Sequence, residues 1–389
     1  MKKYLLSLAV MAMGATLLTG CLGDDSKGGG DTPTEILVTK GAFVINNGNY
    51  YQAIDGSLTY FDATTGAAEQ NVYKKVNGKS LGGTPNDVLV YGQKVYIVGS
   101  DENTIFVLDV RNFKELAEVS TTELLGDAEG LNPRRIAAYE DKVYFTTYGG
   151  YVAAIDTISI SLKAKYQVGS YPEGLALGAS PSSSTLPAIY VANSDGVGGN
   201  GDISVIDIMS GTVTSLVVDK VKNPQEILVA GSTLYVLDFG YYDETGQKDA
   251  GVYKIDGNNV KLVVPNATGM TGYGNYIFTF NDPWDANTAP SYSIYDIEND
   301  TLSSLYLYGD TSHPILSPCA ISIDPNPYSE RIFIASRQLD PDSQYQYPSY
   351  AMPGFVNVYG INGQYAGYFD AGVEPHKIEF SYGTQKIVY

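Results

Sequence analysis

A four-strand unit repeats along most of the chain, and this repeat restricts the possible folds more than any other feature. Each unit begins with a turn and a short strand such as 86–90 (Asn-Asp-Val-Leu-Val), followed by a second strand such as 95–98 (Val-Tyr-Ile-Val). A third strand ends in aspartate, as in 105–109, and a more polar fourth strand such as 115–119 closes the unit. Short runs rich in Val, Ile and Tyr are typical of strands rather than helices.

The unit occurs seven times, whether it is counted by its third strand or by its first. The third strand is expected at Leu58–Asp62, Thr104–Asp109, Tyr151–Asp156, Asp202–Asp207, Gly251–Asp256, Ser291–Asp296 and Gly354–Tyr359. The first strand is expected to start near Pro85, Pro133, Pro172, Pro224, Thr268, Pro318 and Pro375. Repeats of roughly 40 to 50 residues with four strands are typical of propeller blades.

A closed ring follows from the composition of these strands. A single blade would expose apolar side chains on both faces, whereas radial packing buries both faces and closure protects the strand edges. We therefore predict an all-β fold, a seven-bladed β-propeller of four-stranded antiparallel blades over residues 39–389.

The repeat is out of phase with the termini, so one blade should combine strands from both ends of the chain. The last first strand, at 375–380, needs outer partners at 58–62 and 68–73. Its second strand could be either 42–46 or 386–389, and the sequence leaves that choice open.

The first 20 residues predict a lipoprotein signal peptide. Lys2 and Lys3 precede an apolar run that is too short to span a membrane and that ends in Leu-Thr-Gly-Cys at 18–21. This ending resembles the lipobox of bacterial lipoproteins, which implies a lipid on Cys21. Residues 21–38 are expected to form a flexible tether. The acidic pair at 24–25 resembles the export signal of Bacteroidetes surface lipoproteins, which implies a lipid-anchored protein of the outer membrane that faces the cell exterior.

Composition excludes several classes of function. The net charge of -19 argues against nucleic acid as a partner, because the phosphates would be repelled. Only two histidines are present, so a zinc site with several imidazoles is excluded. Neither a P-loop nor a Gly-x-Ser-x-Gly elbow occurs, and Cys319 is expected to be a small core residue rather than a nucleophile. We predict no catalytic residues and no metal ligands, although the oxygen-rich segments 195–202 and 282–287 could hold calcium or simply form turns.

The loops between second and third strands lie on one face of a propeller and are very unequal here. They are short at 100–103 and 148–150, of middle length at 47–56, and long at 193–202, 238–250, 281–290 and 336–353. Long loops on a rigid scaffold usually carry function. Their aromatic residues are the predicted ligand contacts: Tyr50, Phe239, Tyr241, Tyr242, Trp284, Tyr345 and Tyr347.

The turns that join consecutive blades line the centre of the same face. The residue after each proline is expected to point into the central funnel, which gives Asn86, Arg134, Glu173, Gln225, Cys319 and His376. All but Cys319 are further predicted ligand contacts, and the ring fits ligand recognition and a hydrated channel equally well. An aromatic rim above such a ring suits a large, flat, partly apolar ligand, a sugar or a protein partner.

The units at 172–207 and 224–256 resemble the YVTN or YncE-like propeller repeat, with Pro-x-x-(Ile/Val), Val-Tyr-Val and Val-x-Asp elements. With the lipobox and the acidic tether, this layout resembles the Bacteroidetes surface lipoproteins of the BtuG group. The resemblance implies capture of cobalamin (vitamin B12) or a related corrinoid, as cargo rather than as a cofactor. It also implies delivery to a TonB-dependent, BtuB-like transporter of the outer membrane.

Three other functions remain open. The first is a glycan-binding surface lipoprotein, which would use the same aromatic rim. The second is a propeller enzyme of the lactonase or lyase type, which would need a metal or a base such as Glu173 or Glu226 at the funnel. The third is a structural surface-layer protein. We expect a binding protein rather than an enzyme.

Replacing Cys21 by serine should abolish lipid attachment, because the modified thiol is lost. The wild-type protein is expected to incorporate a labelled fatty acid and to fractionate with membranes, and the Cys21→Ser variant to do neither. Continued labelling of the variant would contradict a lipid on Cys21.

Overall fold

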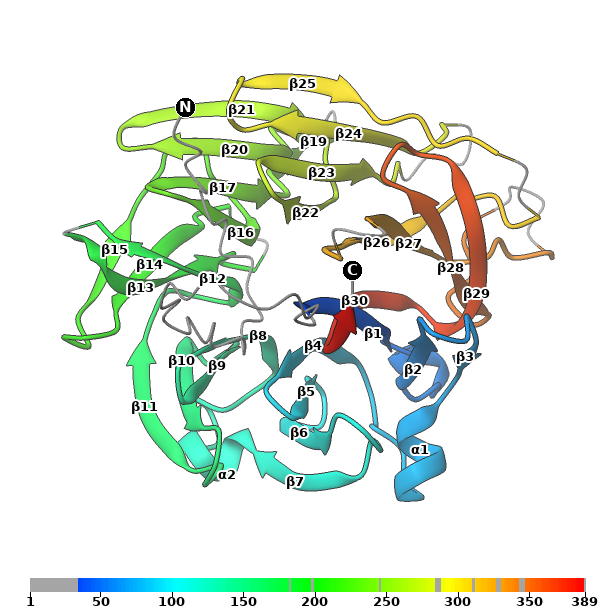
Figure 1. The fold of residues 1–389 in the computed structure, drawn as a ribbon. Coiled ribbons are helices and arrows are strands. Elements are labelled where there is room, and N and C mark those ends of the chain that lie inside the picture. Colours follow the sequence, from blue (N-terminus) through cyan, green and yellow to red (C-terminus); the bar gives the residue numbers. More distant parts are fainter. Residues whose placement is uncertain are drawn as a thin grey trace, which may run out of the picture.

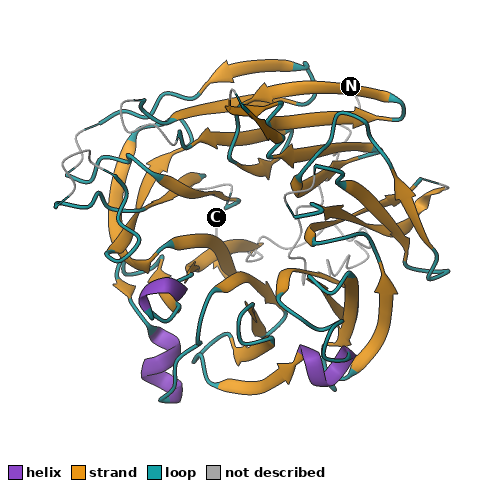
Figure 2. Ribbon diagram, turned by 180° about the vertical axis from the view of Figure 1, so that it is seen from behind, coloured by secondary structure: helices purple, strands orange, loops and turns teal. Residues whose placement is uncertain are grey.

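The computed structural model describes residues 34–181, 183–196, 199–244, 246–283, 288–309, 312–326, 330–342 and 347–387. The predicted signal peptide, Cys21 and most of the predicted tether therefore lie outside the described residues. The described chain forms one closed ring of seven four-stranded antiparallel sheets (Figures 1 and 2). The predicted seven-bladed β-propeller is confirmed.

Each blade runs from an inner strand at the ring centre to an outer strand at the rim. In that order the strands are β30 (Pro375–Ile387), β1 (Thr34–Asn46), β2 (Ser57–Asp62) and β3 (Ala68–Glu69) in the closing blade; β4 (Pro85–Tyr91), β5 (Lys94–Gly99), β6 (Thr104–Asp109) and β7 (Glu115–Ser120) in blade two; β8 (Pro133–Tyr139), β9 (Lys142–Thr147), β10 (Tyr151–Asp156) and β11 (Leu162–Gln167) in blade three; β12 (Pro172–Ser180), β13 (Ser183–Asn193), β14 (Asp202–Asp207) and β15 (Val213–Leu216) in blade four; β16 (Pro224–Ala230), β17 (Thr233–Asp238), β20 (Gly251–Asp256) and β21 (Asn259–Pro265) in blade five; β22 (Gly269–Tyr273), β23 (Tyr276–Asn281), β24 (Ser291–Asp296) and β25 (Thr301–Ser304) in blade six; and β26 (Pro318–Asp324), β27 (Arg331–Ser336), β28 (Pro353–Gly360) and β29 (Tyr365–Val373) in blade seven.

The ring is closed by a long antiparallel ladder between β1 and β30, which runs from Thr34 opposite Ile387 to Asn46 opposite Pro375. The second strand of the closing blade is thus the N-terminal segment that contains 42–46, and the C-terminal segment continues the inner strand instead. The ladder begins at Thr34, so residues 34–38, which the sequence assigned to the tether, already belong to the propeller. Their apolar residues Ile36, Leu37 and Val38 suit a strand better than a flexible linker.

The outer strand of the closing blade is shorter than the predicted 68–73. It ends at Glu69, and the helix α1 (Val72–Asn77) follows, because Asn71 adopts a left-handed conformation with φ of 57° that breaks the strand. Val72 and Tyr73 are buried by the helix instead. Two other short helices are present in the described residues, η1 (Tyr50–Gln52) and α2 (Thr121–Leu125). No helix in these residues has the length and apolar character needed to cross a membrane.

An apolar cluster fills each of the seven junctions between neighbouring blades. The central residue of every second strand is a large aromatic side chain that packs toward the following blade: Phe43, Tyr96, Tyr144, Tyr190, Tyr235, Phe278 and Phe333. All of these side chains are at most 5% exposed. The Val-Tyr-Val element of the repeat is therefore the residue pattern that joins one blade to the next.

The aspartate at the end of the third strand stabilises the turn that follows. The Oδ1 atom of Asp156 accepts the backbone N–H groups of Ile158 and Ser159 at 2.9 and 2.7 Å, and Asp62 accepts those of Thr64 and Thr65 at 2.8 and 2.9 Å. These bonds to the ionised form lower the pKa of both carboxyl groups. The recurrent aspartate is thus a structural feature of the repeat.

The strand order defines two faces. The upper face carries the loops between second and third strands and the segments that join blades, and the lower face carries the remaining turns. Because the inner strands start at the upper face, β30 runs from the upper to the lower face and β1 runs back. The extra pairs from Thr34 to Thr39 therefore extend the ladder at the lower face, where the described chain begins.

Truncation of a junction aromatic should destabilise the ring. Tyr96→Ala is expected to lower the free energy of unfolding by about 3–5 kcal/mol, as for other buried aromatic side chains that leave a cavity. Tyr96→Phe should cost about 1 kcal/mol or less, because the buried hydroxyl has no hydrogen-bond partner among the described residues. Urea unfolding of both variants checks this. Equal losses in the two variants would show that the hydroxyl, rather than the ring, stabilises the junction.

Candidate functional site

The inner strands begin with irregular pairing at the upper face, which directs polar side chains toward the ring centre. The register against the second strand shifts between Pro85 and Asp87, and between Pro133 and Ile136. The same shift follows Pro172, Pro224 and Pro318. Bulges of this kind re-aim side chains out of the ladder. Blades two to five and the closing blade thereby contribute one or two residues each to the floor of a central site.

Arg134 and Glu173 form the first part of this floor. The guanidinium Nε of Arg134 donates to Glu173 Oε2 at 2.9 Å, and the hydroxyl of Tyr148 donates to Glu173 Oε1. The Arg134 guanidinium also lies 4.7 Å from the centre of the Tyr148 ring. Glu173 is only 4% exposed, so its charge is compensated mainly by the Arg134 guanidinium and the Tyr148 hydroxyl.

Arg135 is the residue that connects the blades across the centre. Its Nη1 atom donates to the backbone oxygen of Asn86 at 2.9 Å and lies 3.3 Å from Nε2 of His376. Its Nη2 atom lies 3.8 Å from Glu226 Oε1. Because blade three is adjacent to neither the closing blade nor blade five, these contacts to His376 and Glu226 can form only over the central axis.

The charge of Arg135 is maintained by surrounding carboxylates. Burial by itself would lower the pKa of Arg135, but Asp87, Glu226 and Glu173 raise it above its ordinary value. The Nε donor of Arg135 is buried and has no partner among the described residues. Buried donors in proteins are normally satisfied, so this position calls for an acceptor from water or a ligand.

His376 is held in its neutral form. Burial lowers its pKa well below the ordinary value, and the positive charges of Arg135, Arg134 and Lys377 lower it further. With Arg135 as the donor, Nε2 of His376 is the acceptor and carries no proton. This histidine is therefore a hydrogen-bonding group in the floor and is poorly placed to gain a proton.

Four of the predicted funnel residues belong to this network. Arg135 contacts Asn86 and His376, and Asn86 Nδ2 donates to the Arg134 backbone oxygen at 2.9 Å, which links the Arg134–Glu173 pair to them. Two other predicted positions have local partners: Gln225 donates to Asn223 Oδ1 at 2.6 Å, and the Cys319 thiol donates to the Ser317 backbone oxygen at 3.5 Å. Burial raises the pKa of the Cys319 thiol to about 12, so it stays protonated.

The predicted aromatic rim is partly exposed. Tyr50, Tyr241, Tyr242 and Tyr347 are 71%, 40%, 68% and 52% exposed, and Tyr51 reaches 95%. Phe239 instead packs against the apolar cluster between blades five and six. Tyr241 and Tyr242 belong to a small hairpin of β18 (Tyr241–Asp243) and β19 (Gly246–Lys248) within the long loop of blade five. Trp284 and Tyr345 lie outside the described residues.

A second ionic cluster surrounds Arg337, in the long loop of blade seven. Arg337 forms a paired interaction with Glu374, with Nε donating to Oε2 at 2.6 Å and Nη2 donating to Oε1. Its guanidinium lies 4.9 Å from the centre of the Tyr350 ring, and its Nη1 atom lies 3.4 Å from Asp282 Oδ2. Burial raises the pKa of Asp282, although Arg337 opposes the shift. Asn49 Nδ2, next to Tyr50, donates to the Tyr350 backbone oxygen at 2.8 Å and so connects the loop of the closing blade to the long loop of blade seven.

The oxygen-rich segments considered for calcium have ordinary turn contacts where they are described. Asp202 accepts from Asn193 Nδ2 at 2.7 Å and from the Ser215 hydroxyl at 2.5 Å, and Asp195 accepts from Asn200 Nδ2 at 3.3 Å. The described residues contain no group of three or more His, Cys, Asp or Glu side chains placed to hold a metal ion. Parts of both segments, including 284–287, lie outside the described chain.

Sequence reasoning missed Arg135, Tyr148, Arg337 and Glu374. Arg135 had a visible signal, because it follows Arg134 at the start of an inner strand, where a bulge presents both residues to the centre. Glu374 similarly precedes the Pro375 turn. Tyr148 and Arg337 carried no such signal, because their roles depend on contacts with residues of other blades.

Comparisons with known proteins are consistent with this fold. Residues 40–170 match the family model described as a domain of unknown function (DUF5074). No curated protein matches the sequence. A Bacteroides uniformis protein provisionally assigned as a 6-phosphogluconolactonase is similar in structure, with a TM-score of 0.56, 14% identity, and coverage of 88% of this chain and 100% of that one. A hypothetical selenium-binding protein from Sulfolobus tokodaii gives a TM-score of 0.57 at 11% identity, covering 90% of this chain and 94% of that one. At such identities the similarity shows the fold alone.

The neutral state of His376 predicts a pH effect on stability. The unfolded chain binds a proton on this histidine below about pH 6.5 and the folded protein does not. The free energy of unfolding therefore decreases as the pH falls below that value. His376→Gln should therefore reduce the loss of stability between about pH 6.5 and 5, relative to wild type, in urea unfolding.

The other histidine, His313, stacks on Tyr368 at 3.8 Å and provides a matched His313→Gln control. An unchanged pH dependence in His376→Gln, or the same change in both variants, would contradict the assignment.

Proposed function

We propose that this protein is a lipid-anchored protein of the outer-membrane surface that captures a ligand on its upper face. The observation that carries the proposal is the pairing of a connected polar floor around Arg135 with exposed tyrosines on the surrounding long loops. The floor provides charged donors and acceptors, and the rim provides flat apolar surface at low conformational cost. Tyr50 and Tyr51, which are 71% and 95% exposed, contact each other with 5.7 Å between ring centres, so the rim presents a pair of exposed rings.

Cobalamin is the ligand that we propose for this face. It is large, with a flat macrocycle edged by amide groups, and its rings can stack on tyrosines while its amides bond to polar side chains. The buried Nε donor of Arg135 would match an amide oxygen. Delivery to a TonB-dependent, BtuB-like transporter follows from the resemblance to the BtuG group and belongs to the same proposal.

The geometry also favours an upper face directed away from the anchor. The described chain begins at the lower end of β1, and the 13 residue steps between Cys21 and Thr34 reach at most about 45 Å. A lipid on Cys21 would therefore tether the lower face and leave the upper face open to the exterior.

Lactone hydrolysis is the second candidate, because the floor places Glu173 and Glu226 beside a histidine and two arginines. The environment of His376 weighs against it, since a general base must gain a proton and Arg135 opposes that charge. Hydrolysis of 6-phosphogluconolactone by the purified protein, lost in Glu226→Gln, would favour the enzyme. Retention on a polysaccharide gel would favour a glycan ligand.

Calorimetric titration with cyanocobalamin tests the proposal. We expect a nanomolar or tighter dissociation constant, and a loss of about tenfold in Tyr51→Ala or Tyr242→Ala, equivalent to roughly 1.4 kcal/mol for a lost ring contact. Tyr276→Ala is the matched control, because this tyrosine is 44% exposed at a turn of the lower face. If the titration showed no heat of binding, cobalamin would be excluded as the ligand.

A further inference from the structure

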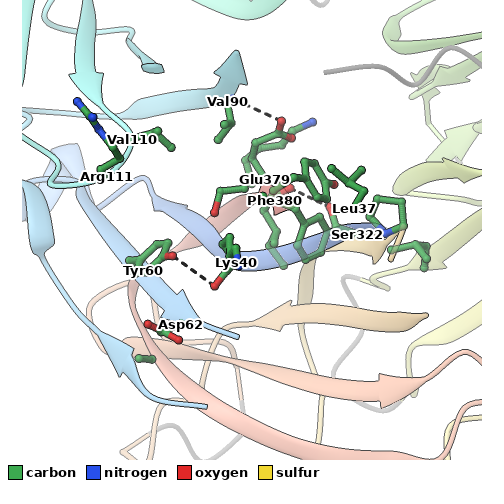
Figure 3. A pocket seen from close by; sticks show the side chains of 18 of the residues that line it. Leu37, Lys40, Tyr60, Asp62, Val90, Val110, Arg111, Ser322, Glu379 and Phe380 are labelled. Carbon is green, nitrogen blue, oxygen red and sulfur yellow. Dashed lines mark hydrogen bonds between the residues drawn. The ribbon is translucent and has the colours of Figure 1, made fainter. Parts of the chain in front are cut away.

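A cavity of about 1360 Å³ opens on the lower face, opposite the candidate site. Its wall includes the turn residues Gly92 and Gln93, and Val110 and Arg111, which belong to lower-face turns of blade two. The inner strands β30, β26 and β22 provide the other walls, and Leu37 and Lys40 of β1 lie at its edge (Figure 3). The cavity therefore reaches from the lower rim to the ring centre.

One carboxylate reaches into this cavity from the inner strand of the closing blade. Along β30, Ile378 and Phe380 pack into the cluster between blade seven and the closing blade, so Glu379 between them points the other way, toward blade two. Its Oε1 atom accepts the Val90 N–H group at 3.4 Å, and no described residue donates to its other oxygen (Figure 3). Burial raises the pKa of Glu379 to about 7, and Asp87 adds to the rise while Lys377 opposes it.

Two of the cations around the cavity are paired with carboxylates other than Glu379. The Nζ atom of Lys377 lies 3.9 Å from Oδ1 of Asp87 in β4, and Nη2 of Arg111 lies 2.6 Å from Oδ2 of Asp109. Lys40 is exposed at the cavity edge. The other acidic groups that line the cavity have partners as well, since Glu69 pairs with Lys75 at 2.9 Å and Asp62 accepts two backbone N–H groups. Glu379 is thus the acidic side chain in the cavity wall with the least compensation.

Aromatic side chains supply much of the remaining wall. Tyr60 and Phe113 contact each other at 4.9 Å between ring centres on the side of blade two, whereas Phe380 and Tyr382 line the cavity from the opposite face of β30. Tyr273 contributes from blade six, where its hydroxyl donates to Glu330 at 2.5 Å. A carboxylate at the end of an aromatic cavity is the arrangement by which proteins recognise organic ammonium groups.

We propose that the lower cavity is a second binding site, which takes a small primary amine with an apolar body, with Glu379 as the partner of the ammonium group. The apolar body would lie against Val110 and the rings of Tyr60 and Phe113, which line the cavity on the side of blade two. The residues proposed to contact the amine are not among those proposed to contact the upper-face ligand, so this proposal does not depend on the ligand proposed there.

A pair of matched probes isolates the charge recognition. Calorimetric titration of the purified protein with 2-phenylethylamine and with the uncharged 2-phenylethanol at about pH 8.5 should give at least tenfold tighter binding of the amine. At about pH 5.5 the amine keeps its proton while Glu379 gains one, so the preference should disappear. Equal affinities at the higher pH, or no binding of either probe, would overturn the proposal.

Two variants identify the residue responsible. Glu379→Gln keeps the size of the side chain and should remove the preference for the amine, with thermal unfolding as a check that the ring stays folded. Glu69→Gln, in the same cavity wall but 58% exposed and paired with Lys75, should keep the preference. A preference that survives Glu379→Gln would overturn the assignment. Tyr51→Ala should leave amine binding unchanged, which separates this result from any outcome on the upper face.

Discussion

The pairing of β1 with β30 is the interaction on which the rest of the molecule depends. An open arc of blades would leave two apolar junction surfaces in water, one at each end, together with unpaired strand edges. The ladder from Thr34–Ile387 to Asn46–Pro375 removes both by building one blade from the two ends of the chain. It also extends beyond the ring at the lower face, and there it shapes the edge of the cavity that contains Glu379.

Seven junctions of similar construction give the ring its rigidity. The aromatic residue in the middle of each second strand fills the space between two blades, as Tyr96 does between blades two and three. Since every blade is held on both sides, the inner strands can carry irregular pairing at their upper ends without loss of the sheet. Those irregularities release Arg134, Arg135 and Glu173 from the ladder and turn them to the axis. The same packing thus makes the ring rigid and allows these few residues to lie outside the regular strand pairing.

Charge is distributed over the two faces in different ways. On the upper face, Glu173, Glu226 and Glu374 each lie beside an arginine, so the floor is a connected network with few free groups. On the lower face, Glu379 has one long hydrogen bond within the described part of the chain, to Val90 N–H. Buried carboxylates that are well paired favour structure and orientation, whereas a poorly compensated one is available to an external cation. This contrast is the physical basis for assigning different ligand chemistry to the two faces.

The sequence by itself determined the fold: the number of blades, the positions of the third strands, the closure from both termini and the face that carries the long loops. These features are local, because a strand period, a turn proline or a terminal aspartate is visible within about ten residues. The sequence also named four members of the central floor through their position after the blade-joining turns. Only the tertiary structure decided which groups meet. Arg135 and His376 are 241 positions apart and become partners across the axis, and Glu379 faces Val90 across 289 positions. Such contacts depend on the radius of the ring and the aim of each bulge, which no local pattern encodes.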